Sequence, residues 1–227
     1  MSQAIHSSDR SGRPGILGTI KKILSFYKLP LYVMIRPFSG FYAMKYEGQG
    51  TMWVALFNFI MVSLSLSFSA QYASIVVNPR HPNMIHSVWD FVAVTTAVTL
   101  FCVSNWAVTS LTDGEGRFKD IFMAVCYAMT PIVLTFIPAS IFSNILTYDE
   151  GAFYHMIISI AIAWFAFLVF AGLVTVHNYT ATKAVATVLL TFVALLIILF
   201  LTALMSTLWN QLWIFVYSLY FEISFRV

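Results

Sequence analysis

Residues Leu111 to Asp120 read Leu-Thr-Asp-Gly-Glu-Gly-Arg-Phe-Lys-Asp and lie between two long apolar runs. This stretch holds five of the chain's 21 Lys, Arg, Asp and Glu residues. The whole 227-residue chain is 60% apolar and 9% charged, whereas a soluble domain is roughly 25% charged. The composition therefore predicts a membrane protein with several spans, in which polar stretches such as this one connect the helices.

A helix needs about 20 mainly apolar residues to cross the hydrocarbon core. The apolar runs are continuous and lack the alternation of a membrane barrel strand, so we expect helices. We predict an all-α polytopic membrane protein, a bundle of five transmembrane helices with an amphipathic helix at each end. The predicted spans are Met52 to Tyr72, Phe91 to Leu111, Ile121 to Phe142, Phe153 to Thr175 and Ala184 to Thr207. They give an amino-terminal segment with an interfacial helix (1–50), a five-helix domain (51–207) and an aromatic-rich interfacial segment (208–227).

Lys and Arg residues are concentrated on one predicted side of the membrane, and short loops rich in them stay in the cytoplasm. The opposite side has only Arg80 and Arg226. We therefore expect a multi-pass plasma-membrane protein whose amino terminus is cytoplasmic and whose carboxyl terminus is extracytoplasmic. The residues on the cytoplasmic side are Arg10, Arg13, Lys21, Lys22, Lys28, Arg36, Lys45, Arg117, Lys119 and Lys183.

Each end of the chain carries a candidate interfacial segment. Between Pro14, which can open a helix, and Pro30, which can close it, apolar residues recur at helical spacing. The basic residues Lys21, Lys22 and Lys28 lie away from that apolar face. They either hold the helix against anionic headgroups or recruit a cytosolic partner. The aromatic residues after Thr207 form either a belt at headgroup level or an amphipathic helix that packs on a neighbouring subunit.

Motifs of the common enzyme classes are missing from the sequence. It has no His-Glu-x-x-His, no Gly-x-Ser-x-Gly and no phosphate-binding Gly-rich loop. His81 and His86 share a loop with Asp90, but two His residues five positions apart beside prolines are weak support for a metal site. We expect no enzymatic activity, no cofactor, no metal and no nucleic-acid partner.

Polar side chains inside the predicted spans are candidates for contacts between helices. Asn58, Asn105, Tyr127 and Thr130 are such residues, and Pro131 and Pro138 are expected to kink the third span and free backbone carbonyls. Hydrogen bonds between helices or a substrate path would each explain this pattern.

The segment from Leu111 to Phe122, with Trp106 before it and Tyr127 to Pro131 after it, resembles the central signature of the Yip1 domain family, especially its bacterial members. Arg36 to Gly40, Lys45 to Glu47 and His177 to Ala184 are also similar, so the resemblance covers roughly residues 35 to 207. It implies a five-span bundle with a cytosolic amino terminus. Eukaryotic members bind small GTPases through long cytosolic regions, which the fifty or so residues before span one do not match; we expect no small-GTPase binding. Some bacterial members are encoded with ABC-type sugar importers, which implies an accessory subunit.

The charged stretch is the candidate site for docking a partner. Gly114 and Gly116 are expected to adopt positive φ in a tight turn, and the stretch is either a satisfied helical-hairpin turn or a docking element. Its candidate docking residues are Asp113, Gly114, Glu115, Gly116, Arg117, Phe118, Lys119 and Asp120. We predict a non-enzymatic accessory or scaffolding subunit of a membrane transport complex, with the lipid bilayer and other membrane-protein subunits as partners. The alternative is a small stand-alone transporter or channel.

Overall fold

The computed structural model describes residues 27–78 and 87–225. Every regular element in these residues is a helix, and five helical stretches are long and apolar enough to cross a membrane. This result confirms the predicted all-α fold with five spans. The five stretches are Met52–Tyr72, Ser87–Leu111, Phe118–Ser143, Tyr148–His177 and Ala181–Phe225.

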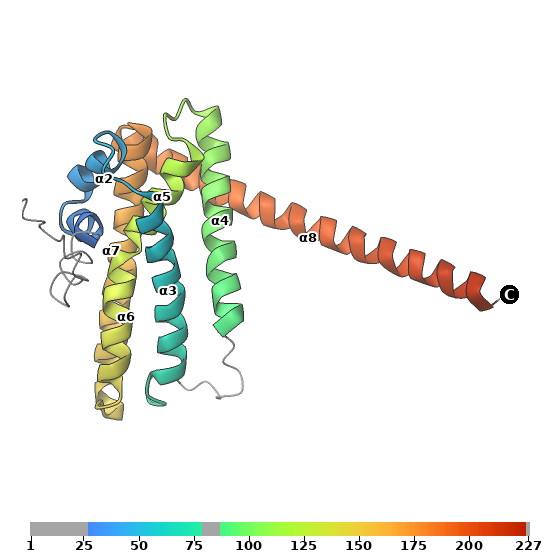
Figure 1. Ribbon diagram of the computed structural model, residues 1–227, viewed down its shortest axis with the longest axis horizontal. Helices are drawn as coiled ribbons and strands as arrows, with labels where there is room; N and C mark the ends of the chain where they lie inside the picture. The colour runs from blue at the N-terminus through green and yellow to red at the C-terminus, as the bar shows by residue number, and fades with distance from the viewer. Residues whose placement is uncertain (1–26, 79–86, 226–227) are drawn as a thin grey trace, which may run out of the picture.

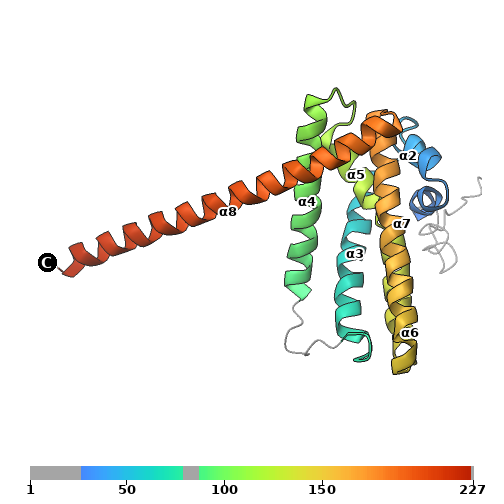
Figure 2. The same cartoon turned by 180° about the vertical axis from the view of Figure 1, so that it is seen from behind.

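Four of the five spans stand side by side and form the bundle (Figures 1 and 2). They are α3 (Met52–Tyr72), α4 (Ser87–Leu111), α5 with α6 (Phe118–Ala128 and Thr130–Ser143) and α7 (Gly151–His177). From Asp120 to Ala128, every residue of α5 except Phe122 is buried. Because α5 packs against α3, α4 and α7, it forms the centre of the core and fixes where its own first residues lie.

The third span is broken rather than merely bent. α5 ends at Ala128, Met129 adopts φ −73° and ψ −6°, and α6 begins at Thr130 with Pro131 in its first turn. Because Pro131 has no N–H to give the Tyr127 carbonyl, the Thr130 hydroxyl donates to that carbonyl instead, at 2.7 Å. The backbone irregularity is therefore satisfied inside the protein, as a membrane interior requires.

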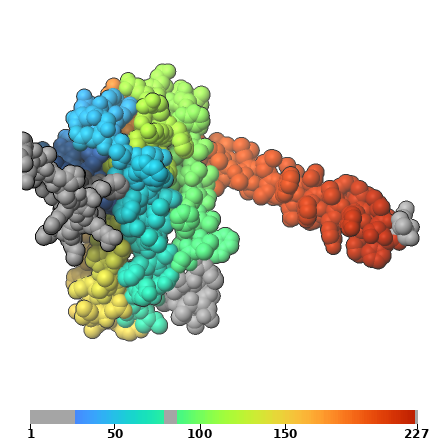
Figure 3. Space-filling model, viewed as in Figure 1, coloured from blue at the N-terminus to red at the C-terminus, as the bar shows by residue number. Residues whose placement is uncertain are grey.

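The fifth span is much longer than a membrane requires. α8 (Ala181–Phe225) has 45 residues, or roughly 68 Å at 1.5 Å per residue, against about 30 Å of hydrocarbon. Its start packs on α4, and the helix then leaves the bundle obliquely (Figures 1 and 3). The boundary predicted at Thr207 is not a helix end, because the sequence of α8 contains no Gly or Pro to stop the helix. Residues 208–225 continue α8 and are exposed on all sides.

A helical hairpin packs beside the bundle ahead of α3. Residues 27–35 are helical, and α2 (Pro37–Lys45) follows. The helix does not close at Pro30 as expected but continues to Ile35. The corner comes at Arg36 (φ −129°, ψ 79°), because Pro37 disfavours the α conformation of the residue before it. Lys28 is exposed; Lys21 and Lys22 lie outside the described residues.

Candidate functional site: the loop between α4 and α5

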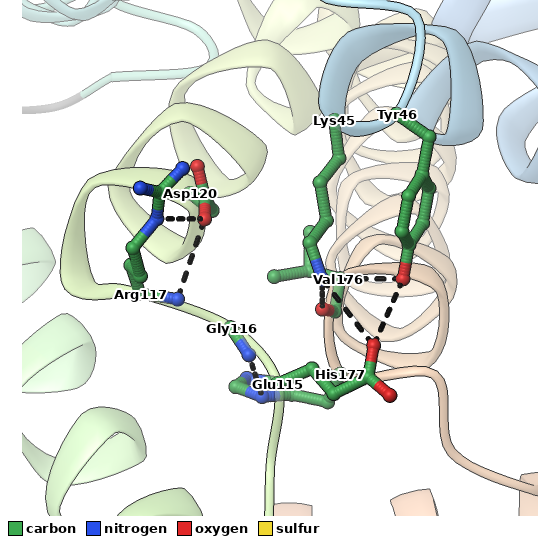
Figure 4. Close-up of polar contacts among 8 residues, drawn as sticks. All are labelled: Lys45, Tyr46, Glu115, Gly116, Arg117, Asp120, Val176 and His177. Carbon is green, nitrogen blue, oxygen red and sulfur yellow. Dashed lines mark hydrogen bonds and ion pairs between the residues drawn. The ribbon is translucent and has the colours of Figure 1, made fainter.

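Residues 112–117, which we call the α4–α5 loop, connect two spans at one end of the bundle (Figure 1). The carboxyl ends of α2 and α7 and the connection from α7 to α8 lie at the same end (Figures 1 and 4). Side chains from these elements contact the loop from below and from one side. The loop conformation therefore depends on residues far away in the sequence.

His177, at the end of α7, supports the loop from beneath. Its side chain is buried, with 2% exposed, and its Nδ1 accepts a hydrogen bond of 3.3 Å from the Gly116 backbone N–H. An accepting Nδ1 carries no proton, so Nε2 is the protonated nitrogen and donates to Asn105 Oδ1 at 3.1 Å. The Asn105 amide then donates to Thr191 Oγ1 at 3.1 Å. One neutral imidazole thereby connects the loop to α4 and, through Asn105, to α8.

Tyr179 fixes the beginning of the same loop. Its ring stacks on the His177 ring with centroids 5.3 Å apart, and its hydroxyl donates to the Thr112 carbonyl at 3.1 Å. Asn178 allows this approach because it adopts a left-handed conformation (φ 54°) that ends α7. The α7–α8 connection therefore covers the underside of the α4–α5 loop.

The two glycines of the loop are required by close packing and not by positive φ. The positive φ lies at Asp113 (53°), and neither Gly114 nor Gly116 has one, so the expected torsions are wrong. A Cβ on Gly114 would lie 2.6 Å from the Tyr179 hydroxyl. A Cβ on Gly116 would lie 2.6 Å from His177 Cε1. Only glycine lets the loop backbone descend onto the two rings.

The end of α2 holds the loop from the side (Figure 4). Lys45 Nζ donates to the Val176 carbonyl at 2.5 Å and lies 4.0 Å from a carboxylate oxygen of Glu115. The Tyr46 hydroxyl donates to the same oxygen at 3.3 Å. Glu115 is therefore the one acidic residue of the α4–α5 loop with described partners on another element, and it joins the loop to the amino-terminal hairpin.

Asp120 is the third residue of α5 and is not a surface residue. It is 4% exposed, and its Oδ2 accepts hydrogen bonds of 3.3 Å from the backbone N–H and the Nε of Arg117. A carboxylate at this position caps the helix and complements the positive end of its dipole. Of the eight candidate docking residues, Asp113, Glu115, Arg117, Phe118 and Lys119 are exposed, whereas Asp120 serves the fold.

The polar residues within the spans contact neighbouring helices. The Asn58 amide donates to the Cys126 carbonyl, beside the break between α5 and α6, and to Thr130 Oγ1 at 3.2 Å. The Tyr27 hydroxyl donates to Asn58 Oδ1; burial raises the pKa of Tyr27 to about 12, so it remains protonated. The Tyr127 hydroxyl accepts from the backbone N–H of Thr51, where α3 begins, at 3.2 Å.

A family model for the Yip1 domain matches residues 31–204, more than two thirds of the chain. The protein belongs to the Yip1 domain family. No curated protein and no solved structure matches the chain significantly. Membership agrees with the five apolar helices, and the protein is a multi-pass integral membrane protein of this family.

The structure brings together three segments of this Yip1 protein that resembled the family separately. Lys45 and Tyr46, the α4–α5 loop, and the pair His177 and Tyr179 meet at one end of the bundle. Sequence reasoning singled out the loop but missed His177 and Tyr179 as its support. The sequence feature that could have pointed to these two residues was the resemblance of the segment from His177 to Ala184 to the family. That resemblance singles out the segment, but it does not say which residues the segment contacts.

Proposed function

We propose that this Yip1 protein is a non-enzymatic accessory or scaffolding subunit of a membrane transport complex, an ABC-type sugar importer being one such complex. The α4–α5 loop docks a partner at the cytoplasmic face of the plasma membrane. Other membrane subunits associate with the apolar surface of the spans. The basic residues that precede α3 and flank the loop support the cytoplasmic assignment.

The observation that carries the proposal is the way the α4–α5 loop is held. Its backbone is fixed from beneath by His177 and Tyr179, while Asp113 and Lys119 are exposed and form no hydrogen bond or ion pair with the described residues. A loop ordered before binding loses little conformational entropy when a partner docks. The opposite charges of Asp113 on this loop and of Lys119 in the first turn of α5 favour a partner of complementary charge pattern.

The surface of α8 supports association within the membrane. From Leu199 to Phe225 every residue is exposed, and most are large and apolar. Helices in a bilayer associate by close packing and interhelical hydrogen bonds, and an extended apolar helix with few neighbours of its own offers area for such packing.

The proposal is tested by purifying the protein from its native membranes in a mild detergent and identifying the polypeptides that accompany it. Asp113→Asn combined with Lys119→Gln should weaken their retention, because both charges are lost while Asn still tolerates the positive φ of Asp113. Asp149→Asn, an exposed acid at the opposite end of the bundle, is the matched control. If no polypeptide co-purifies in several mild detergents, the subunit proposal is wrong.

A second candidate function is a small stand-alone transporter or channel. The observation that favours it is the break between α5 and α6, because discontinuous helices often line substrate sites. The carbonyls of Cys126 and Tyr127 at this break are, however, already paired with Asn58 and Thr130. Solute flux catalysed by the protein alone in liposomes would favour this function over the subunit.

A further inference from the structure

A cleft of about 940 Å³ opens between the helical residues 27–35, α2 and the start of α3. It is separate from the α4–α5 loop, none of whose residues line it. Its volume lies in the range of roughly 300–1,000 Å³ that small-molecule sites occupy. The cleft therefore has the size of a binding site, and its lining indicates what it binds.

Both signs of charge line this cleft. Lys28 on the first helix and Glu47 after α2 are exposed, and Lys28 has no hydrogen bond or ion pair with the described residues. Glu47 accepts one hydrogen bond, of 2.7 Å, from Gln49. A ligand with one negative and one positive group would satisfy both residues, whereas Glu47 would repel a purely anionic ligand.

Aromatic rings line the same cleft as these two charges. Tyr32 comes from the first helix, four residues after Lys28 and so on the same face, and Tyr42 and Phe38 come from α2. Ring faces attract a cation within about 6 Å. The positive group of the ligand therefore fits between Glu47 and the rings, and the negative group fits at Lys28, which suits a phosphate.

The cleft adjoins the start of the span α3, where the membrane surface is expected. Its floor includes Thr51, the residue that begins the span α3, and Trp53 in the first turn is 78% exposed, as is typical at headgroup level. From Trp53 an exposed apolar stripe continues down α3 at helical spacing, through Phe57, Ile60 and Leu64. A lipid with its headgroup in the cleft can lay its acyl chains along this stripe.

We propose that the cleft binds a zwitterionic phospholipid whose headgroup carries a phosphate and a primary ammonium, as in phosphatidylethanolamine. Lys28 binds the phosphate, and Glu47 with the tyrosine rings binds the ammonium. The site is independent of the partner proposed for the α4–α5 loop. It gives the amino-terminal hairpin a fixed position on one leaflet.

The experiment measures lipid binding to the delipidated full-length protein by native mass spectrometry. Phosphatidylethanolamine and phosphatidylglycerol with identical acyl chains serve as probes. We expect phosphatidylethanolamine to bind more tightly. Lys28→Gln should weaken its binding about tenfold, the change expected for one charge-assisted contact. Glu47→Gln should weaken the binding of phosphatidylethanolamine by a similar factor. It should strengthen the binding of phosphatidylglycerol, because the repulsion between Glu47 and an anionic headgroup is removed.

Lys119→Gln and Asp113→Asn make the same charge changes outside the cleft and should leave both affinities unchanged. Equal or tighter binding of phosphatidylglycerol to the native protein would overturn the headgroup assignment. So would a loss of binding in the control variants as large as in the cleft variants. Glycerophosphoethanolamine has the headgroup without acyl chains. If it binds as tightly as the intact lipid, the ligand is a soluble phosphoamine and the lipid proposal is wrong.

Discussion

Single atoms decide the shape of the α4–α5 loop. Gly116 approaches the His177 ring so closely that one added methyl group would lie 2.6 Å from a ring carbon. The ring itself is fixed by Asn105 on its other side, and its burial leaves little room to move away. The loop and the ring therefore constrain each other, and a small change at either residue acts on both.

Gly116→Ala should destabilise the protein by about 1–3 kcal/mol, the usual cost of overpacking a well-packed site. The reason is steric, since Gly116 has no positive φ that alanine would strain. Thermal unfolding in detergent measures the change. Gly151→Ala is the control, because the nearest side-chain atom would lie 3.6 Å from its new Cβ, an ordinary contact. Equal melting temperatures for the two variants would contradict the packing argument.

The hydrogen bond between His177 and Asn105 should be measurable as a coupling energy. His177→Ala removes the acceptor of the Gly116 N–H as well as the donor to Asn105, so we expect about 2–4 kcal/mol of destabilisation. Asn105→Ala should destabilise the protein by less than His177→Ala does. The double variant should cost less than the two single variants together, by about 1 kcal/mol. Strict additivity would mean that the two side chains do not act together.

Residue by residue, the sequence shows polar atoms more clearly than it shows their partners. Asn58 and Asn105 are conspicuous because each interrupts an apolar run, which is a local signal. The partner of Gly116 is 61 residues away, and only the packing of α4, α5 and α7 brings the two together. The torsions of Gly114 and Gly116 were predicted wrongly because glycine also serves close packing, and composition does not distinguish the two uses.

Among the helices, the break between α5 and α6 is held by a side chain of α3. Asn58 contacts both the Cys126 carbonyl and Thr130. Asn58→Ala should cost about 1–2 kcal/mol, within the range found for hydrogen bonds between membrane helices. Ser104→Ala is the matched control, because the buried Ser104 hydroxyl has no hydrogen-bond partner among the described residues. Its removal should be neutral or stabilising.

Unfolding titrations of both variants in mixed detergent micelles give these free energies. A cost for Ser104→Ala as large as that for Asn58→Ala would show that the loss of side-chain volume, and not the hydrogen bonds, determines stability at these positions.

The elements were the most predictable level of the fold. Hydropathy is summed over about 20 residues, so each span is visible in its own sequence, and Pro131 marked the break in the third span. The length of the helix α8 was underestimated because the aromatic residues after Thr207 were assigned to an interfacial segment separate from the fifth span. The absence of Gly and Pro from the residues of α8 is the signal that favours a continuous helix.

For the whole molecule, orientation in the membrane determines which partners the loop can meet. The distribution of basic residues predicts that the α4–α5 loop lies in the cytoplasm and that the connection from α6 to α7, around Asp149, lies outside. Cysteines introduced by Lys119→Cys and Asp149→Cys test this directly, because both positions are exposed. The native Cys102 and Cys126 are fully buried, so they contribute little background labelling.

An impermeant thiol reagent applied to intact cells should label the protein carrying Asp149→Cys and leave Lys119→Cys unmodified. Permeabilised cells should show labelling of both, which controls for reactivity. The result bears on the proposed function, because a loop outside the cell could not contact a cytoplasmic subunit. Labelling of Lys119→Cys but not Asp149→Cys in intact cells would invert the topology. It would also move the phospholipid cleft, which lies at the same end of the bundle, to the outer leaflet.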